Sequence, residues 1–164
     1  MGFLSLVVVP DESPMEVRPI RTILLATDLT AASREATERA IDLATRLDAR
    51  LLIVNVLEKG RLSGGGSHDR VDQARREREA HLVKVVRDAR AAGVTAEFLV
   101  WEGDPGGSIA AAAEAEAADL VVVGTRGRSS AERMLLGSVS DHVVRHAGCP
   151  VLVVRPSGRR PDGG

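Results

Sequence analysis

Apolar residues along the chain follow two patterns, short unbroken runs and longer stretches with helical spacing. Unbroken runs such as Leu120–Val123 are typical of buried strands, whereas apolar positions every three or four residues are typical of amphipathic helices. We predict strands over residues 22–27, 51–57, 95–101, 120–124 and 151–154, and helices over 31–47, 69–92, 105–117 and 138–146.

Local signals support the predicted boundaries. Gly93 follows the second helix, where glycine can adopt the left-handed conformation that ends many helices. Asp104 followed by Pro105 is typical of a helix start, because the aspartate caps and proline fits the first helical position. The segment 58–68 contains the glycines 64–66 and is predicted to be a flexible loop.

Alternating strands and helices predict parallel strands joined by right-handed crossovers. Strands that are apolar throughout indicate a sheet covered on both faces. We therefore expect an α/β fold, a doubly wound, flavodoxin-like (Rossmann-like) five-stranded parallel sheet of order 3-2-1-4-5 with helices on both faces. In such sheets ligands bind beyond the carboxyl ends of the strands where the order reverses, here between the strands 22–27 and 120–124.

The composition sets limits on this picture. A chain of 164 residues predicts a single domain, which we assign to residues 19–156, with an N-terminal tail at 1–18 and a disordered tail at 157–164. The net charge of -1 predicts no general attraction to nucleic acid or acidic membranes. The apolar run at 3–9 is too short to span a membrane. The single cysteine, Cys149, fits a reducing compartment, so we expect a cytoplasmic protein.

A glycine-rich segment follows the fourth predicted strand and indicates a phosphate site. Gly124 and Gly127 would let the backbone approach a ligand, and Gly137-Ser138 opens a helix whose free N–H groups favour an anion. Arg126 and Arg128 either neutralise phosphates or are solvated loop residues. A purely structural alternative exists, since residues 138–141 and 129–132 both read as capping boxes.

The spacing Gly124-x-x-Gly127, nine residues, then Gly137-Ser138 resembles the nucleotide-binding branch of the universal stress protein family, whose UspA-like members share this fold. The resemblance extends from about residue 21 to residue 155 and includes the segments 23–28, 54–56, 103–109 and 137–155. Two departures from the family pattern are Leu29-Thr30 in place of Gly-Ser and Asn55 in place of a frequent histidine.

The resemblance implies ATP binding, with Mg²⁺ held through the nucleotide and not by protein side chains alone. It implies that Asp28 lies near the adenosine, that Val56 contacts the adenine, and that the three glycines, Ser138 and Val139 bind ribose and phosphates. The residues expected at the site are Ala26, Thr27, Asp28, Val56, Gly124, Thr125, Arg126, Gly127, Arg128, Gly137, Ser138, Val139 and Ser140.

Other motifs bear on the function class. The sequence has neither a P-loop nor a Gly-x-Gly-x-x-Gly after the first strand, and no acid–base pair is identifiable near the glycines. We therefore expect an ATP-binding regulatory or stress-response factor, not an enzyme with fast turnover. A slow ATPase or nucleotidyl transferase and a nucleotide-free interaction module stay open as alternatives. His142 and His146 share a helix face and are interpreted as surface residues in preference to metal ligands.

The predicted strand order leaves two edges. The edge strand 151–154 is apolar throughout, which predicts antiparallel pairing with a second copy, and the family resemblance implies the same homodimer. The apolar segment 3–9 could instead cover this edge within one chain. Trp101, on the opposite edge strand, is expected to be a packing residue.

Overall fold

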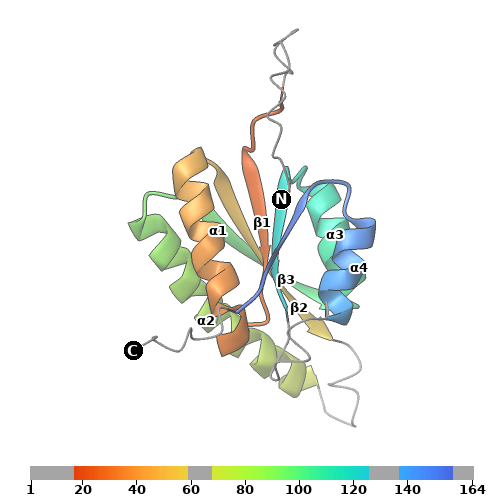
Figure 1. Ribbon diagram of the computed structural model, residues 1–164. Helices are drawn as coiled ribbons and strands as arrows, with labels where there is room; N and C mark the ends of the chain where they lie inside the picture. The colour runs from red at the N-terminus through yellow and green to blue at the C-terminus, as the bar shows by residue number, and fades with distance from the viewer. Residues whose placement is uncertain (1–16, 59–67, 126–136, 157–164) are drawn as a thin grey trace, which may run out of the picture.

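The computed structural model describes residues 17–58, 68–125 and 137–156 (Figure 1). The expectations for the tails, for the glycines 64–66 and for residues 126–136 therefore lie largely or wholly outside the described residues. The strands are β1 Thr22–Ala26, β2 Arg50–Glu58, β3 Ala96–Gly103, β4 Leu120–Gly124 and β5 Val151–Val154. The helices are the 3₁₀ turn η1 Ala31–Ser33 and the α-helices α1 Arg34–Leu47, α2 His68–Ala91, α3 Pro105–Ala115 and α4 Ser138–His146.

The five strands form one parallel sheet of order β3-β2-β1-β4-β5, which confirms the predicted fold class. β1 lies at the centre, with Ala26 level with Val54 of β2 and with Val123 of β4. The chain moves outward from β1 to β3 on one side and from β4 to β5 on the other. The order reverses between β1 and β4, and the carboxyl ends of these two strands meet there.

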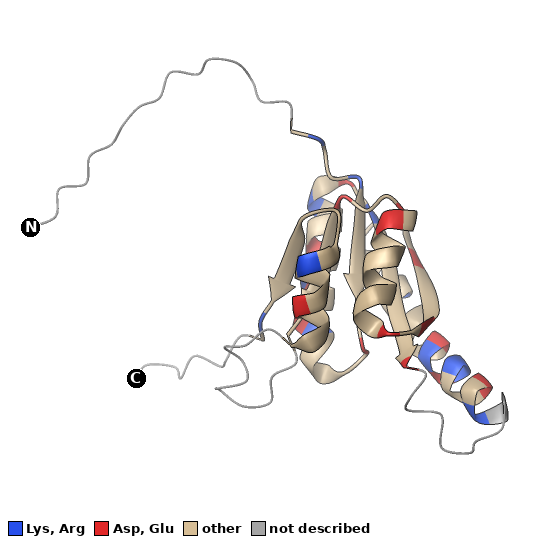
Figure 2. Cartoon of the chain, turned by 90° about the vertical axis from the view of Figure 1, so that its right-hand side faces the viewer, with Lys and Arg blue, Asp and Glu red and all other residues tan. Residues whose placement is uncertain are grey.

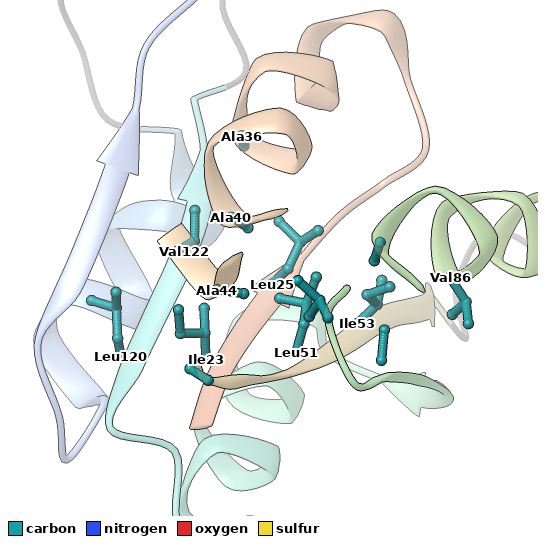
Figure 3. Close-up of a cluster of buried hydrophobic side chains, with 14 of the residues drawn as sticks. Ile23, Leu25, Ala36, Ala40, Ala44, Leu51, Ile53, Val86, Leu120 and Val122 are labelled. Atoms are coloured by element: carbon teal, nitrogen blue, oxygen red, sulfur yellow. The ribbon is translucent and has the colours of Figure 1, made fainter. Parts of the chain in front are cut away.

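Two apolar cores flank the sheet, because alternate residues of each strand point to opposite faces. Figure 1 shows α1 and α2 on one side of the sheet and α3 and α4 on the other. The α1/α2 core takes its strand residues from odd positions of β1, such as Ile23 and Leu25, and the α3/α4 core from even positions, such as Leu24 and Ala26. In Figure 3 the strand side chains of the first core reach toward the small residues of α1. The buried residues of α1 are Ala36, Ala40 and Ala44.

Several boundaries differ from the predictions by a few residues. The first helix begins with the turn η1, so α1 proper starts at Arg34. Leu47, expected in the buried stripe, is 44% exposed, because α1 ends there and Asp48 turns the chain with a φ of 51°. The third helix ends at Ala115 instead of Ala117, whose φ of 48° is left-handed. Its start is as predicted, since the Asp104 carboxylate accepts a 2.8 Å bond from the Gly107 N–H.

Charged residues lie mainly on the helices and loops (Figure 2). Both signs are interspersed on α2, the helix that carries most of them in this view. Within the described part of the chain, no helix is long and apolar enough to cross a membrane.

Candidate functional site

The candidate site lies where β1 and β4 end side by side. Pairing continues one residue past each strand, since the Thr27 N–H donates to the Val54 carbonyl at 3.0 Å and the Thr125 N–H donates to the Val154 carbonyl at 3.1 Å. These bonds fix the backbone at the point where the sheet order reverses. The site that sequence reasoning placed after β1 and β4 is therefore held by backbone pairing on both sides of the crevice.

The turn after β1 is organised by short polar side chains. The Asp28 Oδ1 accepts bonds from the Thr30 N–H at 3.0 Å and from its hydroxyl at 2.7 Å. The Thr27 hydroxyl accepts a bond from the Leu29 N–H and lies 3.0 Å from the Ser33 hydroxyl. Asp28 thus holds this turn, as aspartates do in Asx turns, at the half-buried mouth of the crevice.

Leu29 stands where the pattern of the resembled family has glycine, and its backbone has a conformation that favours glycine. Its φ is 63°, in the left-handed region that costs a residue with a Cβ about 1 kcal/mol. The Leu29 side chain packs against the α1/α2 core, which offsets part of this cost. Leu29 therefore adopts a backbone conformation that glycine adopts more easily.

Asn55 is a buried polar residue whose role the sequence did not predict. It is 1% exposed, and its Nδ2 donates to the Thr27 carbonyl at 2.8 Å. Arg78 of α2 donates to the Asn55 Oδ1 at 3.0 Å. The side chain therefore connects α2 to the backbone directly before Asp28. The one feature of the sequence that could have indicated this role is an amide side chain inside the apolar run of β2. Its partners could not be predicted, because they lie far away in the sequence.

Three of the expected ligand-contacting residues share one face of the sheet. Ala26 belongs to the α3/α4 core, and Val56 and Val139 pack against it while staying partly exposed. Thr27 and Asn55 point to the opposite face, toward Ser33 and Arg78. The apolar part of the candidate site therefore lies on the side of the sheet that α3 and α4 cover.

The start of α4 lacks a side-chain cap. Gly137 is the N-cap, with φ of -65° and ψ of 158°, and within the described residues no side-chain cap bond is made there. The structural alternative of a capping box at residues 138–141 does not hold, because Ser138 is already the first helical residue and is exposed. The buried Ser140 hydroxyl donates instead to the Gly137 carbonyl at 3.0 Å. The first turn therefore presents backbone N–H groups and the positive end of the helix dipole.

The end of β4 contains one unsatisfied polar group and one glycine. Thr125 is 2% exposed, and its hydroxyl has no hydrogen-bond partner among the residues that the structure describes. A Cβ added at Gly124 would lie 3.6 Å from the Ala36 Cβ and 3.7 Å from the Ser33 Cα, which are ordinary contacts on the α1 side. An added Cβ at residue 124 would thus point toward α1, and this geometry does not support the expectation that glycine is needed there to avoid a clash with a ligand. Arg126, Gly127 and Arg128 lie outside the described residues.

The two histidines of α4 lie together without further ligands nearby. Their rings stack with centroids 4.1 Å apart, and the His146 Nδ1 lies 2.8 Å from the His142 carbonyl. No group of three or more His, Cys, Asp or Glu residues suited to a metal occurs in the described segments. Cys149 packs against the α3/α4 core, and this burial raises the pKa of its thiol. A raised thiol pKa disfavours the reactive thiolate.

A hollow lies at the opposite end of the strands, where β1 and β2 begin. Arg21, Asp48 and Arg50 are among its lining residues. Arg50 is already paired with Glu97 at 2.7 Å and with Glu116 at 3.0 Å, so its positive charge is compensated. Arg50 is therefore not a free cation for an anion in this hollow.

Comparison with known proteins places the chain in a family. A model of the Universal stress protein family matches residues 19–155, nearly the whole described chain. The chain belongs to the universal stress protein family. Among curated universal stress proteins, one from Methanocaldococcus jannaschii is 36% identical over 139 residues, which is 82% of either chain. The predicted resemblance to the family is confirmed.

Solved universal stress protein structures share the fold. One, described as a complex with cAMP, has a TM-score of 0.66 and 29% identity, and the alignment covers 84% of this chain and 98% of that one. Another, from Archaeoglobus fulgidus and described as a complex with dAMP, has a TM-score of 0.63 over 84% of this chain and all of that one. At 20% identity this second likeness shows the fold alone.

Proposed function

We propose that this universal stress protein binds ATP between the ends of β1 and β4 and acts as a nucleotide-dependent regulatory factor of the stress response. The observation that carries the proposal is the start of α4, which has glycine at its N-cap and no side-chain cap among the described residues, together with the buried Thr125 hydroxyl, which lacks a partner among those residues. The related structure described with cAMP supports an adenine nucleotide as the ligand class.

The phosphates would bind at the start of α4. The N–H groups of Ser138 and Val139 lie in the first turn, where helix geometry leaves them without intrahelical acceptors. An anion there gains charge-assisted hydrogen bonds and the favourable dipole, as at other helix N-termini. The exposed Ser138 hydroxyl is available for one more bond. The φ of -65° at Gly137 suits any residue, so backbone conformation does not require the glycine, which supports a steric reason for it.

The adenine would bind at the other end of the crevice. Val56 is partly exposed beyond the α3/α4 core and offers an apolar surface of the kind that purine rings contact. Asp28 lies one residue beyond Thr27, at the end of β1, within the turn that Asn55 supports. Mg²⁺ would be held by the phosphates and by water. In this proposal occupancy of the site is the signal, which a protein partner reads in the cytoplasm.

Calorimetric titration of ATP tests the proposal. The wild-type protein should bind ATP, and Gly137→Val should show no heat of binding, because a branched side chain at the N-cap occupies the phosphate space. Gly148→Val is the matched control, since a Cβ at Gly148 meets no atom within 4 Å. Unchanged ATP affinity in a natively folded Gly137→Val protein would refute the phosphate assignment. Phosphate release measured on the same samples tests the alternative of slow ATP hydrolysis.

We also propose a homodimer through β5. All four residues of this edge strand are only partly buried, although they are apolar and pack against the two cores. Pairing with the same strand of a second copy would cover both this surface and the open backbone edge. Light scattering should give a dimer for the full chain and for a chain starting at Met15. A full-length monomer would reject this assembly, and dimerisation only after truncation would favour the N-terminal segment as the cover.

A further inference from the structure

Trp101 is a large apolar side chain left exposed near the candidate site. It is the one tryptophan in a chain that has no tyrosine and two phenylalanines. We predicted from the sequence that Trp101 is a packing residue, yet this residue is 39% exposed and lies outside both cores. Its place is near the carboxyl end of β3, the edge strand next to β2.

The direction of this side chain follows from two polar contacts with α2. Arg75 of α2 pairs with Glu102 of β3, and Arg78 of α2 donates to Asn55 of β2. Glu102 and Asn55 therefore point to the α2 face of the sheet. Because strand residues alternate, their neighbours Trp101 and Val56 point to the opposite face. Leu99 agrees with this phase, since it packs against the α3/α4 core.

Trp101 and Val56 are also directly paired across the two strands. They are register partners in the parallel β2–β3 ladder, where neighbouring strands lie about 4.8 Å apart. Same-face partners at this spacing form one continuous surface. The apolar surface assigned to the base therefore extends from Val56 outward to the indole of Trp101.

We propose that Trp101 is a base-contacting residue, which forms the outer wall of the adenine subsite and contacts the purine ring of a nucleotide seated on Val56. The inference rests on the proposed function and adds to it a specificity element for an aromatic base. A flat indole beside an aliphatic side chain suits a purine, because aromatic rings gain from stacking on one another in addition to burying apolar area. The exposed area of Trp101 is then the surface that the base covers.

Fluorescence and calorimetry of the full chain test this role. The single tryptophan makes its emission specific to residue 101. Titration with ATP should change that emission, and the midpoint of this change should equal the midpoint of the calorimetric titration. Inorganic tripolyphosphate, which lacks a base, should leave the emission unchanged. Trp101→Ala should weaken ATP binding by at least about fivefold, since removing one base-stacking side chain typically costs this much or more. Its affinity for tripolyphosphate should equal that of the wild type.

Two controls separate the base contact from a loss of stability. Trp101→Phe keeps an aromatic ring and should retain most of the ATP affinity. Val83→Ala shortens another exposed apolar side chain, 38% exposed on α2, and should bind ATP like the wild type.

The outcomes separate this inference from the proposed function. Equal ATP affinity for Trp101→Ala and wild type, with unchanged emission during a calorimetric titration that shows binding, overturns the role of Trp101 and leaves ATP binding intact. Absence of any ATP binding by the wild type overturns both. Equal loss of ATP and tripolyphosphate binding in Trp101→Ala would make Trp101 a general structural residue and would also overturn the base contact.

Discussion

Replacing Asn55 with alanine removes the buried link between α2 and the end of β1. The variant loses the bond from Nδ2 to the Thr27 carbonyl and the bond that Arg78 donates to Oδ1. Asn55 is 1% exposed and Thr27 is 7% exposed, so water does not reach the freed carbonyl without a local opening. Arg78 is half-buried, so water can replace its lost bond.

The expected loss of stability follows from these two groups. A buried carbonyl left unpaired costs about 1–3 kcal/mol, whereas a bond to a half-exposed guanidinium that water replaces costs less than about 1 kcal/mol. We expect the free energy of unfolding to fall by about 2–3 kcal/mol, a large share of the stability of an ordinary domain. For a chain of this size the change corresponds to a Tm lower by about 4–12 °C.

Urea unfolding followed by circular dichroism measures the change, with two variants that bracket it. Arg78→Met removes only the outer bond, but it leaves the buried Asn55 Oδ1 unpaired and should therefore also cost about 1–3 kcal/mol. Thr45→Ala removes an exposed 2.8 Å bond to the Ile41 carbonyl and should stay within about 0.5 kcal/mol of wild type. The structural role of Asn55 would be refuted if Asn55→Ala is no less stable than Thr45→Ala, or if Arg78→Met is as stable as Thr45→Ala.

Two further variants test the packing and the charges around the sheet. Gly106→Ala should lower the free energy of unfolding by about 1–3 kcal/mol, because the added Cβ would lie 2.7 Å from the His142 Cγ. Gly107→Ala is the control and should not lower it, since its added Cβ would lie 3.2 Å from the Asp104 carboxylate. Urea unfolding compares the two variants. The Asp119 carboxylate accepts hydrogen bonds from the backbone N–H groups of Arg21 and Thr22. These bonds, the one from Arg21 most, hold the pKa of Asp119 below its ordinary value. Its stabilisation is complete above the ordinary pKa of about 3.9 and is lost as the pH falls through the lower, folded pKa. The stability difference between wild type and Asp119→Ala should therefore be constant from pH 5 to 7 and shrink below about pH 4; a difference that does not shrink would contradict it.

The fold could be predicted because it depends on repeating, local signals. Runs such as Val121–Val123 leave few options but a strand buried on both faces, and right-handed crossovers then restrict the order of the strands. The helix start at Asp104 was predictable for the same reason, since its cap bonds reach only three residues ahead.

Details of the site depend on contacts between distant residues, which no local pattern carries. Asn55 bonds to Thr27 and Arg78, and only the packing of α2 on the sheet brings them together. The alternative of a capping box at Ser138 does not hold, because the N-cap position belongs to Gly137, one residue earlier than the hydroxyl pattern suggested. The exposure of Trp101 likewise depends on how far the neighbouring elements extend over an edge strand.

The central claim is that an adenine nucleotide binds across the ends of β1 and β4 with its phosphates at the start of α4. Titration of the ¹⁵N-labelled full chain with Mg²⁺–ATP, followed by amide resonances in NMR, tests it most directly. We expect saturable shifts at Ser138 and Val139, at Thr125 and at Val56, with the resonances of Asp48 and Arg50 at the opposite end of the strands unchanged. Shifts confined to the Asp48 and Arg50 pocket, or no shifts at millimolar ATP, would contradict it.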